Sequence, residues 1–243
     1  MELTSLFDAR TRRSLREQLH AMQDLLPDFL QLHRQCAASH GVHLVAGSFP
    51  VRSESGEFHN RAHLFGTGHA IGYQDKLQMT RFETEEWIIT AGDAPKTFDT
   101  PFGRVAIAVC YDSEFPLLVR RQVERGARLI LVPSCTDTMA GYHRVRIACQ
   151  ARALENQCYV IQATTVGDAD WTPAVDINRG AAGVFTPVDK GFPDDGILAM
   201  GAMDEPQWVF ADLDMDAIDR VRKDGQVLNH RDWNGQDRWT TAS

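Results

Sequence analysis

The sequence predicts an α/β fold in which mixed sheets are covered by helices. Continuous apolar runs, which are typical of strands buried on both faces, alternate with helical patterns in the middle of the chain. Hairpin-like strand pairs flank this middle region. The 243 residues contain neither an internal repeat nor a low-complexity linker. We therefore expect residues 1–243 to form a single domain.

The first elements expected are a long helix and a hairpin. Large apolar residues recur near helical spacing over residues 14–38, and Pro27 within them predicts a kink or a break. A strand at residues 42–49 and a return strand at residues 58–65 follow, joined by a turn at residues 53–56. The next stretch, from residue 66, leads into a segment that ends at Lys76.

The remaining elements follow from the same patterns. The apolar run 105–109 predicts a buried strand, and Pro116 suits the first turn of a helix over residues 115–126. Further strands are expected at residues 129–133, 159–164, 181–187 and 208–213, with helices at 143–156 and 214–223. Residues 229–243 are mostly polar and are expected to form an extended C-terminal arm.

Composition and charge argue against several classes of function. The formal net charge of −8 disfavours nucleic acid or an anionic membrane as a partner, because both call for basic patches. No apolar run approaches the roughly 18 residues of a membrane span, and the N-terminus has no signal-peptide pattern. The five cysteines include no CxxC spacing, which indicates reduced thiols. We therefore expect a cytoplasmic protein.

The histidines do not predict a metal site. The closest pairs, His40 with His43 and His59 with His63, lack the helical HExxH arrangement. On a strand, the second pair would lie about 13 Å apart. We expect no metal and no cofactor.

Cys110 is the candidate nucleophile. It lies in the sharp connection between the strand that ends at Val109 and the helix that follows. This geometry lifts a side chain out of the sheet toward helix N-terminal amides, which favour a thiolate and can bind an oxyanion. From position alone, a cysteine at the end of a strand is more often a packed core residue than a nucleophile.

The motifs around Cys110 resemble those of the nitrilase (carbon–nitrogen hydrolase) superfamily. Residues 103–116 contain Gly-Arg, a short apolar strand, Cys-Tyr-Asp and Phe-Pro, as the family's nucleophile motif does. The sequence Tyr-Gln-Asp-Lys at residues 73–76 resembles the lysine motif, and Arg-Ala-Leu-Glu-Asn at residues 152–156 resembles a helix end of the family. The resemblance extends over nearly the whole chain from about residue 14.

The resemblance implies both a fold and a reaction. The fold is a four-layer α-β-β-α sandwich of two mixed sheets covered by helices. The reaction is hydrolysis of a small-molecule amide or nitrile, with amidase favoured over nitrilase. Cys110 would form a thioester, while Lys76 and the backbone N–H of Tyr111 stabilise the oxyanion. The resemblance also implies a homodimer or a larger homo-oligomer.

The resemblance assigns further residues to the site. Glu83 is expected to be the glutamate beside the catalytic lysine, with Glu86 as the alternative. Tyr111 and Ser134 are expected to contact the substrate. Cys135 and Trp171 are additional candidates for the pocket wall.

One family feature has no counterpart in this sequence. The general-base glutamate usually follows a proline ahead of the first long helix, but no Pro-Glu pair stands there, and Glu2 is the nearby glutamate. We expect a strand–helix–strand bearing the base to lie upstream of Met1, so that the chain is N-terminally truncated and weakly active or inactive. A catalytically impaired relative is thus an alternative. A Cys–His hydrolase that uses His143 or His63 is a minor one.

Overall fold

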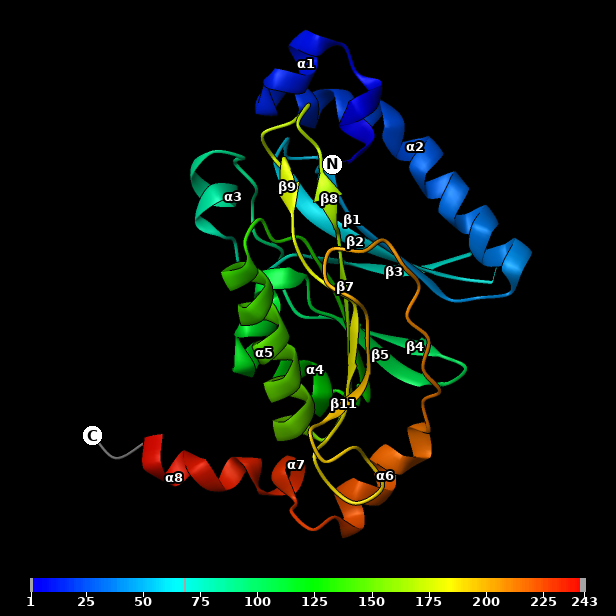
Figure 1. The fold of residues 1–243 in the computed structure, drawn as a ribbon, viewed down its shortest axis with the longest axis vertical. Coiled ribbons are helices and arrows are strands. Elements are labelled where there is room, and N and C mark those ends of the chain that lie inside the picture. Colours follow the sequence, from blue (N-terminus) through cyan, green and yellow to red (C-terminus); the bar gives the residue numbers. More distant parts are fainter. Residues whose placement is uncertain (1, 68, 241–243) are drawn as a thin grey trace.

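The computed structural model describes residues 2–67 and 69–240 (Figure 1). A three-stranded antiparallel sheet has the order β1-β2-β3, and a six-stranded mixed sheet has the order β11-β10-β7-β6-β5-β4. The strands are β1 Leu44–Arg52, β2 Phe58–Gly66, β3 His69–Asp75, β4 Thr97–Thr100, β5 Gly103–Ile107, β6 Leu129–Ser134, β7 Tyr159–Thr164, β10 Gly183–Phe185 and β11 Ile197–Met200. A short ribbon pairs β8 Gly167–Asp168 with β9 Ile177–Asn178.

Helices cover both outer faces of the two sheets. The α-helices are α1 Ala9–Arg13, α2 Leu15–His40, α3 Arg81–Glu85, α4 Pro116–Glu124, α5 Met139–Asn156, α6 Met215–Asp224, α7 Asn229–Asp232 and α8 Asp237–Thr240. The 3-10 helices are η1 Glu2–Leu6, η2 Cys110–Glu114 and η3 Trp233–Gln236. Helix α2 packs on the three-stranded sheet, and α4 and α5 pack on the six-stranded sheet (Figure 1). The predicted four-layer α-β-β-α arrangement is confirmed, and the smaller sheet is antiparallel rather than mixed over the described residues.

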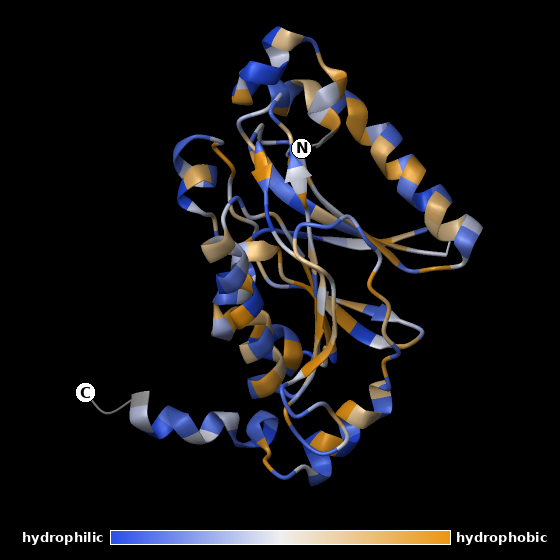
Figure 2. Ribbon diagram, in the orientation of Figure 1, coloured by the Kyte–Doolittle hydropathy of each residue, from blue (hydrophilic) through white to orange (hydrophobic). Residues whose placement is uncertain are grey.

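Helix α2 forms the first layer. Ser14 caps its N-terminus, and Gly41, at a φ of 62°, ends it in the left-handed conformation that glycine adopts without steric cost. Its apolar residues recur along the ribbon (Figure 2), and Met22 packs against Phe49 of the sheet below. The helix continues through Pro27 without the break that the sequence suggested.

Strand β5 and the residues that follow it separate two apolar cores. Val105 and Ile107 face the core between the sheets, whereas Ala106 and Ala108 face the core under α4 and α5. All four are fully buried, because side chains alternate between the faces of a strand. This burial on both sides explains the continuous apolar run in the sequence. It also brings the end of the strand, where Cys110 follows, to the junction of the two cores.

Two predictions for the C-terminal third are wrong. Residues 208–213 form no strand, since Trp208 and Phe210 are 84% and 82% exposed and no described strand pairs with them. The sheet edge beside β10 is taken by β11, which the sequence did not indicate. Residues 229–240 form short helical turns rather than an extended arm, and the Arg120 guanidinium packs over the Trp233 ring.

Candidate active site

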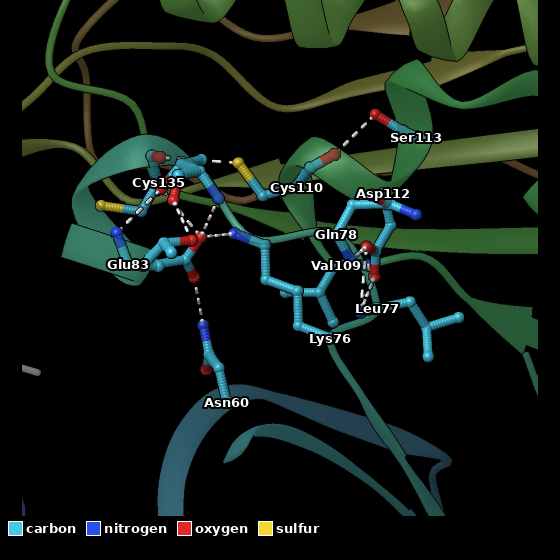
Figure 3. Close-up of polar contacts among 12 residues, drawn as sticks. Asn60, Lys76, Leu77, Gln78, Glu83, Val109, Cys110, Asp112, Ser113 and Cys135 are labelled. Atoms are coloured by element: carbon cyan, nitrogen blue, oxygen red, sulfur yellow. Dashed lines mark hydrogen bonds and ion pairs between the residues drawn. The ribbon is translucent and has the colours of Figure 1, made fainter. Parts of the chain in front are cut away.

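Cys110 opens the 3-10 helix η2, and Ala108 and Val109 separate it from the end of strand β5. Its φ of 50° places a non-glycine residue in the left-handed region, where backbone strain is characteristic of functional sites. The Ser113 hydroxyl donates to the Cys110 carbonyl at 2.7 Å, and the Cys110 thiol lies 3.6 Å from the Cys135 carbonyl oxygen (Figure 3).

The thiol of Cys110 lies in a desolvated position. Burial raises its pKa, and the positive charge of Lys76 and the backbone N–H of Tyr111 oppose that rise. The charge of Glu83 raises it further. A thiol with a raised pKa is protonated at neutral pH, so its attack on a substrate requires a group that accepts the proton.

Lys76 and Glu83 form a buried ion pair beside the thiol. Lys76 is 3% exposed and Glu83 is 4% exposed, and the lysine ammonium donates to Glu83 Oε2 (Figure 3). Buried lysine and glutamate residues occur almost only in such pairs. The structure thus brings together the three residues that the sequence predicted as catalytic, Cys110, Lys76 and Glu83.

Two further side chains hold Glu83, and sequence reasoning missed both. The Thr80 backbone N–H and hydroxyl each donate to Glu83 Oε2 at 2.9 Å, and Asn60 Nδ2 donates to Oε1 at 3.3 Å. Thr80 also caps α3, with Glu83 three residues later completing a capping box. That Thr-x-x-Glu spacing is a signal in the sequence. The alternative, Glu86, is exposed at the end of the same helix.

A cavity of about 480 Å³ opens in front of these residues. Cys110, Lys76 and Glu83 line it together with Ser134 and Cys135, which follow from the end of β6. Apolar side chains from both sheets and from α2 form much of the remaining wall. Glu83 is the one carboxylate among the described residues that line this cavity, and both of its oxygens accept hydrogen bonds.

The other candidates lie elsewhere. The Tyr111 ring packs edge-to-face on Phe115 and is outside the cavity wall, so Tyr111 reaches the site through its backbone N–H. Trp171 is also outside the wall. His143 is exposed on α5, and neither it nor His63 lines the cavity. The side chain of Glu2 lies outside the described residues.

The described residues contain no cluster of three or more histidine, cysteine, aspartate or glutamate side chains that could hold a metal ion. Within the same residues, every helix is too short or too polar to cross a membrane.

Comparison with known proteins identifies the family. The carbon–nitrogen hydrolase family model matches residues 9–222. The chain belongs to the carbon–nitrogen hydrolase family. The predicted membership is therefore confirmed, and this matched range includes Cys110, Lys76 and Glu83.

The chain spans different shares of two curated relatives. The chain is 36% identical to the probable hydrolase YhcX of Bacillus subtilis (strain 168) over 94% of its own length, but it spans only 44% of that relative. It is 27% identical to the omega-amidase NIT2-B of Xenopus laevis, over 83% of this chain and 72% of the relative.

Solved structures share the fold. A carbon-nitrogen hydrolase from Helicobacter pylori G27 superposes with a TM-score of 0.74 at 20% identity, covering 89% of this chain and 76% of that one. A mutant amidase from Nesterenkonia sp. AN1, determined after Michael addition of acrylamide at its active site cysteine, gives a TM-score of 0.63 at 26% identity over the same shares. The first shows the fold alone, and the second also names an amidase.

Proposed function

We propose that this chain carries the acyl-transfer site of an enzyme that hydrolyses non-peptide carbon–nitrogen bonds in small molecules, with Cys110 as the nucleophile. The observation that carries the proposal is the buried Lys76–Glu83 pair, which lines the same cavity as the Cys110 thiol. A buried, paired lysine beside a desolvated thiol is a costly arrangement for a purely structural site.

The proposed reaction has two steps. The Cys110 sulfur attacks the amide carbon and loses its proton, the carbon–nitrogen bond breaks, and the nitrogen leaves as ammonia or an amine after gaining a proton. Water then attacks the thioester, which releases the carboxylic acid and restores the thiol. Each step passes through a tetrahedral intermediate that carries a negative charge on oxygen.

The groups around the thiol suit that oxyanion. The Lys76 ammonium supplies a positive charge at the cavity wall, and the backbone N–H of Tyr111 faces the sulfur. Glu83, fixed by Thr80 and Asn60, orients the ammonium in turn. We assign Glu83 to this orienting role, because its hydrogen bonds leave it poorly suited to take the thiol proton.

The relatives support amides over nitriles as substrates. NIT2-B is named an omega-amidase, and the Nesterenkonia amidase has been determined in complex with butyramide. The acrylamide adduct on that amidase's active site cysteine supports a cysteine nucleophile here as well. Ser134, at the cavity wall next to Cys135, is proposed to contact the substrate.

A second candidate is a catalytically impaired member of the family. Glu83 is the one cavity carboxylate in the described part of the chain, and the Cys110 thiol has a raised pKa. Loss of a general base typically costs about 10²–10⁴-fold in rate. Weak activity of residues 1–243 stays a prediction.

Mass spectrometry of the intact chain tests the proposed function. Butyramide should add an acyl group to Cys110 with release of ammonia, and Cys110→Ala should abolish the adduct. Cys36→Ser is the matched control, since this half-buried thiol lies on α2, outside the cavity. Acylation that persists in Cys110→Ala would contradict the proposed nucleophile. Absence of any thioester from a panel of amides and nitriles would favour the impaired relative.

We also propose that copies of the chain associate through the outer faces of α4 and α5. Leu117 on α4 and Ile147 and Leu154 on α5 are exposed apolar residues. A cytoplasmic location stays a prediction; it agrees with the free thiols of Cys110 and Cys149.

A further inference from the structure

Asp112 is a fully buried carboxylate that lies behind the proposed catalytic residues. It is 0% exposed and is not part of the cavity wall. Its oxygens accept hydrogen bonds from three backbone N–H groups, those of Leu77, Gln78 and Val109 (Figure 3). The first two donors directly follow Lys76, and the third directly precedes Cys110.

On the nucleophile side, Asp112 and Val109 form two hydrogen bonds around Cys110. The Val109 N–H donates to Asp112 Oδ2 at 3.2 Å, and the Asp112 N–H donates back to the Val109 carbonyl at 3.0 Å. Cys110, with its φ of 50°, lies inside this reciprocal pair. A non-glycine residue keeps such a conformation only where the surrounding contacts over-determine it.

On the lysine side, Asp112 fixes the chain just after the ammonium-bearing residue. The Gln78 N–H donates to Oδ1 at 2.7 Å, and the Leu77 N–H reaches both carboxylate oxygens at 3.1 and 3.2 Å. Lys76 thus lies between two carboxylates (Figure 3). Asp112 accepts hydrogen bonds from the two backbone N–H groups that follow Lys76, and Glu83 accepts one from the Lys76 ammonium. The backbone of Lys76 itself bonds to the Asn60 carbonyl at 2.8 Å.

We propose that Asp112 is a positioning residue that sets the Lys76 ammonium at the distance from Cys110 at which it can stabilise the oxyanion. This inference rests on the proposed function, and Asp112 acts through Lys76 and Cys110 without touching the substrate. Small displacements of catalytic groups are costly, and about 1 Å can reduce a rate 10²-fold.

The ionisation of Asp112 agrees with this role. Burial raises its pKa to about 6, while the three N–H groups and the charge of Lys76 oppose the rise. At pH 7 the carboxylate is ionised and accepts all three bonds. Because the folded-state pKa is above the usual value, the protonated carboxyl group stabilises the fold at low pH, and this contribution is lost as the pH rises through 6.

Asp112→Asn is the direct test. The amide is the same size, but one of its two polar atoms becomes a donor and faces a backbone N–H. With butyramide as the probe, we expect the first-order rate of Cys110 thioester formation at saturating amide to fall about 30- to 100-fold. The amide concentration that gives half of the maximal rate should change less than about threefold, because the cavity wall is unaltered.

Alkylation of Cys110 distinguishes a positioning role of Asp112 from a general loss of structure. Iodoacetamide reacts with the Cys110 thiolate without forming an oxyanion, so its limiting rate at a pH high enough to ionise the thiol fully should, in Asp112→Asn, stay within about threefold of the wild-type rate. A merely structural role would lower the melting temperature and both rates together. Asp112→Glu keeps the charge but adds a methylene group, which has to displace one of the two segments, and acylation should fall in this variant too.

Asp189→Asn is the matched control. Asp189 is a second buried aspartate, and it accepts the backbone N–H groups of Lys190, Gln226 and Val227 away from the cavity. This variant should lower the melting temperature and leave acylation unchanged. Wild-type acylation in either Asp112 variant would overturn the inference, as would equal losses of acylation in Asp112→Asn and Asp189→Asn. A wild-type chain that forms no thioester would instead contradict the proposed function, and this inference with it.

Discussion

The two carboxylate oxygens of Glu83 accept hydrogen bonds from different side chains. One carboxylate oxygen accepts hydrogen bonds from the Lys76 ammonium and the Thr80 hydroxyl, and the other accepts one from the Asn60 amide. In Glu83→Gln, the buried Lys76 ammonium loses its counter-charge. Removing one partner of a buried ion pair typically costs about 3–5 kcal/mol, so the free energy of unfolding in urea should fall by about 3 kcal/mol. Thioester formation should fall about 100-fold, because the ammonium is no longer fixed.

Glu85→Gln on the same helix is the control for this prediction. Glu85 is exposed and pairs with Arg81 at 2.8 Å on the surface. Exposed pairs contribute little to stability, so urea unfolding and thioester formation should both match the wild type. Equal losses in the two variants would show that α3 as a whole, rather than the buried pair, is responsible.

The ionisation of Cys110 leads to a prediction about pH. Burial raises the pKa of its thiol against the opposing charge of Lys76, so the reactive thiolate is a small fraction at neutral pH and grows as the pH rises. Iodoacetamide alkylation of Cys110, followed by peptide mass spectrometry, should accelerate roughly tenfold per pH unit from pH 6 to pH 8.

A small reference thiol provides the comparison for that measurement. The rate for an ordinary cysteine peptide begins to level near its pKa of about 8.5, whereas the Cys110 rate should still rise there. A plateau for Cys110 below about pH 8 would contradict the raised pKa. It would also remove the reason for expecting a separate general base.

At the scale of elements, β5, β6 and β7 were the strands that the sequence predicted most directly. Each is covered on both faces, so its apolar run is continuous and stands out from the surrounding sequence. The boundary of β5 still differs, because the structure ends it at Ile107 and the prediction ended it at Val109. Ala108 and Val109, which lie between these two ends, are fully or almost fully buried. The apolar run in the sequence indicates burial rather than the end of the strand.

The elements that the sequence missed depend on partners rather than on pattern. Residues 208–213 have strand-forming residues, but Trp208 and Phe210 are exposed and have no sheet partner among the described strands. Strand β11 has a weak local pattern, and its pairing with β10 defines it. A propensity for extended structure does not specify which segment pairs with which.

The residues of the site likewise fall into those that a local motif predicts and those that only tertiary contacts define. Cys110 and Lys76 lie in recognisable motifs, and Glu83 follows at a family spacing. Asn60 lies 23 residues from Glu83 along the chain, and Asp112 lies 34 residues from Gln78, so no local pattern could reveal either contact. These side chains act through tertiary hydrogen bonds, which the sequence does not display.

At the scale of the whole molecule, the layer formed by α4 and α5 links the surface to the nucleophile. Arg152 of α5 donates to the Ser113 carbonyl at 3.1 Å, within the turn that bears Cys110. On the outer side, Ile147 is 63% exposed, and Leu154, two turns later, shares its face of the helix. An interface over this layer would therefore cover the helix that supports the catalytic turn.

Ile147→Glu tests the proposed association through this layer. A specific interface buries roughly 1,200–2,000 Å² in total, and charge is depleted at its core. A glutamate at Ile147 should therefore convert a dimer or larger assembly into monomers in light scattering after size-exclusion chromatography. Leu32→Glu is the control, because Leu32 is similarly exposed on α2 in the opposite outer layer. Monomers in both variants would indicate non-specific association, and an unchanged mass in Ile147→Glu would place the interface elsewhere.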